Sequence, residues 1–251
     1  MTIILGICCE DKGHYTAVTK VVDEHVTEHV DWVVDILDHC RKWQGRHEDE
    51  PYYKYHKGDY RGPKLHGWIK GKRKVHDADQ WRETLLLFVQ ANPRPDIVVL
   101  VRDVDRDECR LEGIQQARES SEWPFQIVYA AAHPEVEAWR ISGFVPQNER
   151  EERLLEALTK ELKFDPIKQQ DKLTSKPNDA PTDTKIILAR LCGKNEERSD
   201  RCLDDRSLLR ERGQANGFAA FLDQVEKHIL PIFQNGKPGS LTLNAPCGIV
   251  K

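Results

Sequence analysis

The sequence predicts an α/β fold with a Rossmann-like, mostly parallel sheet and a helical C-terminal extension. Three apolar runs support this prediction, at residues 2–9, 97–101 and 125–132. The middle run, Ile97-Val98-Val99-Leu100-Val101, holds no polar residue, which is typical of a strand buried on both faces of a parallel sheet. Stretches with a helical spacing of apolar residues lie between the runs, as βαβ units require.

Helices are predicted where apolar residues recur at intervals of three and four. Residues 16–43 show this spacing throughout and are expected to form one long helix, and residues 77–90 form the next. The polar stretches 164–183 and 195–206 are predicted to be loops. Further helices are expected at residues 112–118, 149–162, 184–191 and 217–233.

The same pattern divides the chain into a core and an extension. Residues 1–145 hold all three strand candidates, with an insertion at about 45–77 that lacks apolar periodicity. Residues 146–251 contain only helical and loop-like stretches, and we expect them to complete the same domain. The last stretch, 235–251, contains Gly and Pro and is expected to form a loose or partner-bound tail.

Composition and charge exclude several classes of protein. The 251 residues are 39% hydrophobic and 32% charged, a balance typical of a soluble globular protein. No apolar stretch approaches the roughly 20 residues of a membrane helix, and no basic leader precedes the first run, so neither a membrane span nor a secretory signal is expected. The seven cysteines form no CxxC pair, which favours reduced thiols in the cytoplasm and argues against a zinc site. With a net charge of -4, any affinity for nucleic acid must come from a local patch.

Acidic residues follow each of the three apolar runs. Asp103 and Asp105 lie at alternate positions after the middle run, so in an extended chain their side chains share a face. Glu10 follows the first run directly, and Glu135 and Glu137 follow the third. Ligands gather at the carboxyl ends of strands in open α/β sheets, and neighbouring carboxylates repel one another unless a cation lies between them. We therefore expect a site for Mg²⁺, which prefers oxygen ligands.

Simpler interpretations stay open for these and nearby residues. A lone Asp-x-Asp pair can be a solvated loop, and Glu10 on its own can be a surface acid. His25 and His29 lie four residues apart, as two metal ligands on a helix would, but without a third ligand we interpret them as surface histidines. Lys12 and His14 are candidates for a phosphate contact, and a surface position is the expectation for both.

The insertion is rich in basic and aromatic residues. Between residues 54 and 76, eight Lys or Arg residues accompany a single acid, with aromatic residues interleaved. Basic groups neutralise phosphates and aromatic rings stack on unpaired bases, so this mixture predicts a nucleic-acid contact. An inserted loop whose aromatic side chains merely pack it down is the alternative. The candidate contact residues are Trp68, Lys70, Lys72, Arg73 and Lys74.

The acidic strand ends resemble those of the Toprim domain of topoisomerases, primases and OLD-type nucleases. In that family a Glu after the first strand and an Asp-x-Asp pair after a later strand surround a divalent metal. Glu10 matches the first of these positions, and Asp103 and Asp105 match the pair. One departure follows Glu10, where many Toprim sequences have Gly and this chain has Asp11.

Two further motifs are similar to those of small stand-alone Toprim-like proteins. The stretch His-Pro-Glu-Val-Glu-Ala-Trp at residues 133–139 resembles a signature in which Glu and Trp are separated by one residue, so Glu137 matches the later Glu of the family. The patterns at residues 217–222 and 229–233 are similar to the ending of the same group.

The resemblance implies a nuclease that hydrolyses the phosphodiester bonds of DNA or RNA with Mg²⁺ or Mn²⁺. Glu10, Asp103, Asp105 and Glu137 would be its metal ligands and catalytic acids. Proteins of this group are often encoded beside an AAA or ABC-type ATPase in bacterial anti-phage defence, so an ATPase partner is expected, and self-association into a homo-oligomer stays open. A non-catalytic regulatory subunit of an ATPase complex is the first alternative. A flavodoxin-like phospho-acceptor domain, with Asp103 as the acceptor, is the second.

Overall fold

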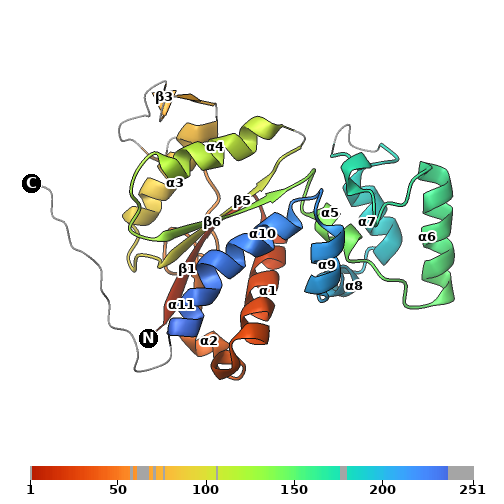
Figure 1. The fold of residues 1–251 in the computed structure, drawn as a ribbon, viewed down its shortest axis with the longest axis horizontal. Helices are drawn as coiled ribbons and strands as arrows, with labels where there is room; N and C mark the ends of the chain where they lie inside the picture. The colour runs from red at the N-terminus through yellow and green to blue at the C-terminus, as the bar shows by residue number, and fades with distance from the viewer. Residues whose placement is uncertain are drawn as a thin grey trace, which may run out of the picture.

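The computed structural model describes residues 2–56, 59–60, 68–69, 72–75, 77–105, 107–175 and 180–236. A four-stranded, fully parallel sheet lies at its centre (Figure 1), in the order β2-β1-β5-β6. The predicted α/β fold with a parallel sheet is confirmed. The strands are β1 (Ile3–Cys8), β2 (Arg41–Gln44), β5 (Ile97–Asp103) and β6 (Gln126–Ala132).

Helices cover both faces of the sheet, because β1 and β5 are apolar on both sides. Leu5 and Val99 point into one core cluster, whereas Val98 and Leu100 point into the other, as alternation along a strand requires. The C-terminal helices thus return to complete the core that the first half of the chain begins (Figure 1). One face carries α1 (Lys12–His29), α10 (Phe218–Gln224), the π-helical η3 (Val225–Ile229) and α11 (Leu230–Asn235), and the other carries α3 (Asp77–Val89) and α4 (Glu108–Glu119).

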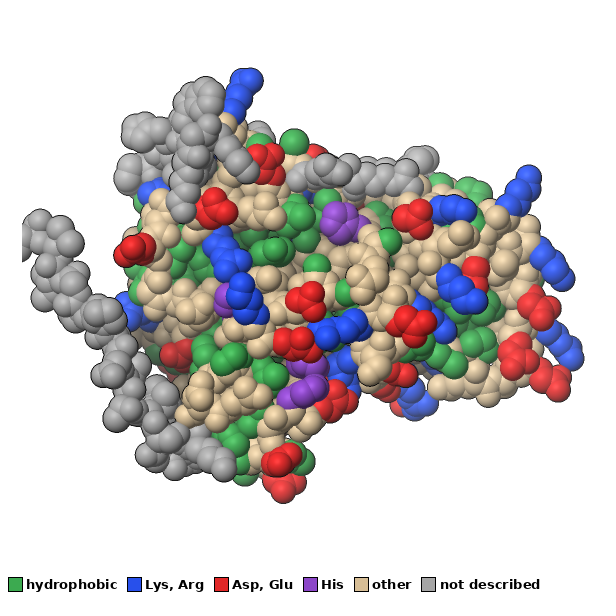
Figure 2. Space-filling view, in the orientation of Figure 1, with side chains coloured by type: hydrophobic (Ala, Val, Ile, Leu, Met, Phe, Trp, Pro, Cys, Tyr) green, Lys and Arg blue, Asp and Glu red, His purple; other side chains and the backbone are tan. Residues whose placement is uncertain are grey.

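The helices between β6 and α10 lie beyond the carboxyl ends of the strands, and several of them share a third apolar cluster. Figure 1 shows them to the right of the sheet, and Figure 2 shows basic and acidic side chains interspersed over the same region. These helices therefore lie beside the carboxyl ends of the strands, where the predicted acids are. These helices are α5 (Glu137–Ser142), α6 (Glu149–Leu162), η2 (Gln170–Lys172), α7 (Thr184–Cys192), α8 (Glu196–Arg201) and α9 (Arg206–Arg212).

The motifs at residues 133–139 and 217–222 meet in the core. Trp139 of α5 is fully buried, stacks on Phe221 with 5.3 Å between ring centroids, and packs edge-on against Phe218. Its indole nitrogen donates a hydrogen bond of 2.8 Å to the carbonyl of Asn216. The aromatic contacts and the satisfied polar atom fix α5 against α10, and therefore fix the start of α5 at the edge of the sheet.

Gly217 precedes α10 in a left-handed conformation, with φ of 85°, and a Cβ atom there would lie 2.0 Å from the carbonyl oxygen of Ala131. Gly193 is also left-handed, but a Cβ atom there would meet nothing within 4 Å.

We expect Gly193→Ala to lower the free energy of unfolding by about 1 kcal/mol, the cost of a left-handed L-residue. Gly217→Ala should cost about 1–3 kcal/mol more, because the backbone of β6 must also move. Urea denaturation of both variants measures the difference, and equal losses would contradict the predicted steric conflict.

The helix predicted for residues 16–43 is too long. α1 ends at His29, and η1 (Asp31–Val33), α2 (Leu37–Cys40) and the edge strand β2 follow. Strand β2 has only four residues and no apolar run, so the pattern of residues 41–44 gave no signal for a strand. It is held by pairing with β1 and by Trp43, whose indole nitrogen donates to Asp23 of α1 at 3.0 Å.

The loop predicted for residues 195–206 is also wrong, because α8 lies within it and α9 begins at its end. None of the α8 side chains is buried, so this helix has no apolar periodicity to find. In the insertion, β3 (Trp68–Ile69) and β4 (Lys72–Arg73) form a short antiparallel pair. No helix in the described part of the chain is long and apolar enough to cross a membrane.

Candidate active site at the carboxyl edge of the sheet

Asp103 is the last residue of β5, and its side chain is buried on the α1 side of the sheet. One carboxylate oxygen, Oδ1, accepts a hydrogen bond of 3.0 Å from the backbone N–H of Val136 and lies 2.9 Å from Nε2 of His14. The other ring nitrogen of His14 lies 2.9 Å from Oδ1 of Asp11, which also caps α1. A histidine in the first turn of α1 therefore bridges two carboxylates.

The expectation that His14 is a surface residue is wrong, since only 3% of it is exposed. Burial alone would lower the pKa of His14, but the carboxylates of Asp103 and Asp11 outweigh it and raise the pKa to about 10. In return, His14 holds the pKa of Asp11 well below its usual range. The imidazole is therefore a cation at pH 7, and it fixes the carboxylate of Asp103 at the end of β5.

Glu135 and Glu137 lie beside Asp103 at the start of α5. Glu135 is buried, accepts a hydrogen bond of 2.6 Å from the hydroxyl of Thr184, and pairs with the ammonium group of Lys185 at 3.2 Å. Burial raises the pKa of Glu137, and the negative charges of Glu135 and Asp103 raise it further, although the Glu137 N–H and Lys185 act against them. Glu137 thus lies in a desolvated and electronegative place, which favours a bound cation or a proton.

Asp105 does not share the face of Asp103, contrary to prediction. The chain leaves the extended conformation after β5, and Asp105 is left-handed with φ of 49°. Its carboxylate pairs with Arg110 at 2.5 Å and accepts a hydrogen bond from the hydroxyl of Ser175. Alternation therefore holds as far as Asp103 and not beyond it, because it applies only to an extended chain.

Glu10 lies toward the opposite face of the sheet. It pairs with Arg102, whose side chain points away from that of Asp103 because the two residues are neighbours in β5. Arg102 in turn lies 3.6 Å from Asp77 at the start of α3. Among the described residues, the predicted acids form no group of three or more with ligand atoms within 4.8 Å of one another. The charge of Asp103 acts on Glu137, whereas Glu10 and Asp105 lie in separate ion pairs.

A cavity of about 570 Å³ lies next to Glu137, between the start of α1 and helices α5, α7 and α8. Its charged lining consists of four basic residues and three acids: Lys12, Arg140, Lys185 and Lys194, and Glu137, Glu196 and Asp200. Arg140 pairs with Asp200 at 3.2 Å, whereas within the described residues the ammonium groups of Lys12 and Lys194 form no ion pair. A concave surface with several cations attracts an anionic ligand such as a phosphate group.

The predicted nucleic-acid contacts are only partly covered by the structure. Lys70 lies outside the described residues, and Trp68 and Lys72 are described only by their backbone in the β3–β4 pair. Arg73 is exposed, and its carbonyl accepts a hydrogen bond from Gln116 of α4. Lys74 pairs with Asp79 at 2.5 Å. Burial is described for the side chains of Arg73 and Lys74, and of these two Arg73 is the exposed one.

Sequence reasoning did not predict the contacts that two basic residues, His14 and Arg110, make with the acids of the site. His14 follows Asp11 by three residues at a helix start, and this spacing of an N-cap acid and a basic residue was the available signal. Arg110 had no such signal, because its contact with Asp105 depends on the turn between them. No family model matches the chain, and comparisons with curated proteins and with solved structures find no significant match.

Proposed function

We propose that the protein is a divalent-metal-dependent nuclease that hydrolyses phosphodiester bonds at the carboxyl edge of its sheet. One observation carries the proposal: Glu137 is largely buried within reach of the charge of Asp103, and it lines a cavity that also holds four basic side chains. The resemblance to the Toprim domain supports the same assignment. In this proposal Asp103 and Glu137 are the central acids, whereas Glu10 and Asp105 stay in their ion pairs with Arg102 and Arg110.

The residues fit a hard divalent cation such as Mg²⁺ or Mn²⁺. All the donors are carboxylate oxygens. Burial raises the pKa of Glu137, and the charges of Glu135 and Asp103 add to it, so a bound cation would favour the ionised form. Asp103 uses Oδ1 for both Val136 and His14, which leaves its second oxygen for a ligand. Asp103 and Glu137 would hold the ion, which when bound polarises a phosphoryl oxygen and acidifies water.

The other residues of the site would bind and position the substrate. Lys12, Lys185 and Lys194 would attract the phosphate backbone into the cavity, and His14 would keep the Asp103 carboxylate in place. Glu137 would share the ion with Asp103 and orient a water molecule beside the scissile phosphate. Arg73 and the neighbouring β3–β4 segment would extend the contact along the nucleic acid.

Glu137→Gln provides the test of this assignment. With Mg²⁺ or Mn²⁺ present, we expect the wild-type protein to cleave DNA, RNA or tRNA. The variant should be slower by roughly 100-fold, because it loses a charge that would help to hold the ion, and a bound metal stabilises the transition state by several kcal/mol. Glu122→Gln is a matched control, because Glu122 is exposed before β6, at the opposite edge of the sheet. Equal loss of activity in both variants, or no metal-dependent cleavage by the wild type, would remove the proposal.

A non-catalytic subunit of an ATPase complex is the second candidate. The ion pairs Glu10–Arg102 and Asp105–Arg110 favour it, because a structural role needs acids that are already neutralised. Co-purification with an ATPase encoded nearby, together with unchanged function of that complex after Glu137→Gln, would support this candidate over the nuclease.

A further inference from the structure

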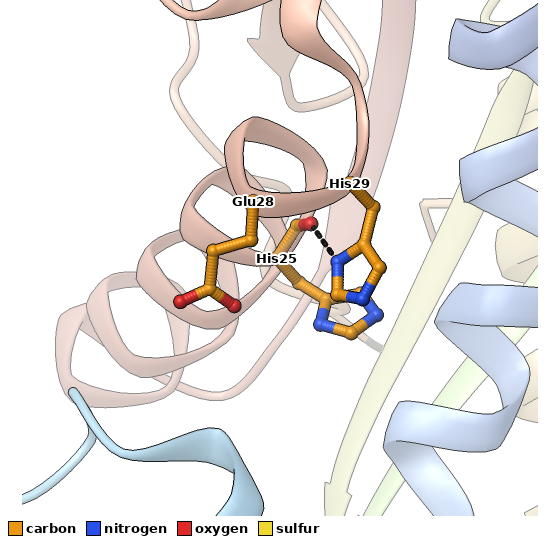
Figure 3. Close-up of side chains that lie close together, drawn as sticks. All are labelled: His25, Glu28 and His29. Atoms are coloured by element: carbon orange, nitrogen blue, oxygen red, sulfur yellow. Dashed lines mark hydrogen bonds between the residues drawn. The ribbon is translucent and has the colours of Figure 1, made fainter.

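A second group of potential ligands lies at the other end of α1. The ligand atoms of His25, Glu28 and His29 lie within 4.8 Å of one another (Figure 3), and no other such group is found among the described residues. His25 lies eleven positions after His14 in the same helix, which corresponds to about 16 Å. This group is therefore distinct from the candidate active site.

His25 is the unusual member of the group. We expected a surface histidine, but only 3% of His25 is exposed, and the expectation is wrong. Within the described part of the chain neither ring nitrogen forms a hydrogen bond, and the nearest acid is Glu226, whose Oε1 lies 3.4 Å from Nε2. Burial, and then the neighbouring His29, lower the pKa of His25 to about 4, so the ring is neutral at pH 7. A buried polar group without a hydrogen bond is costly, and a metal ligand is one explanation for keeping it.

His29 has the arrangement that metal-binding histidines commonly have. Its Nδ1 lies 2.9 Å from the backbone carbonyl of His25, so Nδ1 carries the hydrogen (Figure 3). That hydrogen bond leaves the lone pair of Nε2 for a metal and fixes the orientation of the ring. The two rings lie against each other, with 4.2 Å between their centroids. Both histidines thus present an imidazole nitrogen at one place on α1.

Carboxylates from two elements complete the group. Arg206, the first residue of α9, donates to Glu28 from both Nε and Nη2, with 2.8 Å between Nε and Oε2. An ionised carboxylate has about four lone-pair sites, so this pairing leaves acceptor capacity for a metal. Glu226 comes from η3. Its Oε2 pairs with Arg210 of α9 at 2.9 Å, and its Oε1 faces His25. π-helical turns such as η3 occur frequently at functional sites.

We propose that His25 and His29 bind one Zn²⁺ ion together with a carboxylate from Glu28 or Glu226. Two imidazoles and a carboxylate are an established protein ligand set for zinc, and imidazole suits zinc better than it suits Mg²⁺. With Glu226 as a ligand, the ion would link α1 to η3 and hold the C-terminal helices on the sheet. The lack of CxxC pairs does not bear on this site, because none of its ligands is a cysteine.

The test is a titration of metal-stripped protein with Zn²⁺ in competition with a chromogenic chelator. We expect one Zn²⁺ per chain and a Co²⁺ absorption spectrum typical of tetrahedral nitrogen and oxygen ligands. His29→Ala should weaken Zn²⁺ binding at least tenfold and abolish the Co²⁺ spectrum. The His29 ring is exposed, so this variant should fold normally, as circular dichroism can check. His39→Ala removes an exposed histidine of α2 and should bind Zn²⁺ as the wild type does.

Two results would overturn the zinc proposal. The first is a wild-type protein that takes up no stoichiometric Zn²⁺. The second is a His29→Ala variant that keeps the wild-type affinity. Asp103→Asn separates this proposal from the nuclease: it should keep Zn²⁺ binding intact, and loss of zinc in that variant alone would place the ion at the carboxyl edge and contradict the site on α1.

Discussion

Asp103→Asn is expected to lower Mg²⁺- or Mn²⁺-dependent cleavage at least about 100-fold. Asparagine preserves the size of the side chain, and its carbonyl oxygen can still accept the hydrogen bond from Val136. The negative charge that would hold the cation is lost. Transition-state stabilisation by a bound metal amounts to several kcal/mol, and each 1.4 kcal/mol or so corresponds to a factor of about ten in rate. Initial rates on end-labelled DNA and RNA, measured over a range of metal concentrations, give the effect.

The metal dependence distinguishes this result from a general loss of structure. Asp103→Asn should retain the wild-type circular dichroism spectrum, and Glu122→Gln should cleave at the wild-type rate. If Asp103→Asn cleaved as fast as the wild type with the same metal dependence, Asp103 would not be a metal ligand. The regulatory-subunit alternative would then be the better account.

The largest effect on stability is expected from His14→Gln. The substitution removes the cation that faces the buried carboxylate of Asp103, whose side chain is only 10% exposed. Removing one partner of a buried ion pair typically costs about 3–5 kcal/mol, because the remaining charge is left without compensation. We expect a loss of that size in the free energy of unfolding at pH 7, measured by urea denaturation. His39→Gln, at an exposed position, should change it by less than about 0.5 kcal/mol.

The same residue predicts a dependence of stability on pH in the metal-free protein. The pKa of His14 rises from 6.5 to about 10 on folding, so the folded state binds the proton more tightly than the unfolded chain does. This contribution to stability is complete below pH 6.5 and is lost as the pH rises through about 10. Between these values the free energy of unfolding of the wild type should fall more steeply than that of His14→Gln. Parallel curves for the two proteins would contradict the ion pair.

The central strands could be predicted from the sequence because their environment leaves a simple pattern. The run from Ile97 to Val101 is buried on both faces and is therefore apolar throughout. Strand β2 lies at the edge and is polar at Arg41 and Lys42, so nothing in it resembles a buried strand. Helix α8 was missed for the same reason, since none of its side chains is buried. Pattern reasoning finds the elements that bury apolar area and overlooks those held by pairing or capping.

The candidate site was predictable in its location and not in its geometry. The rule that ligands gather at the carboxyl ends of strands placed Asp103 and Glu137 correctly at one edge. The separation of Asp105 depends on a single left-handed residue, and that of Glu10 on the competing charge of Arg102. Neither conformation is encoded in residue spacing. Burial of His25 depends in turn on helices that return from the end of the chain.

The most direct test of the account is the position of Mn²⁺ in a crystal of the protein soaked with that ion. Anomalous diffraction locates manganese without reference to a model of the site. We predict a peak in contact with the carboxylates of Asp103 and Glu137, and its absence from crystals of Asp103→Asn. A map with no peak at the carboxyl edge of the sheet, or with manganese only beside His25 and His29, would contradict the proposed nuclease site.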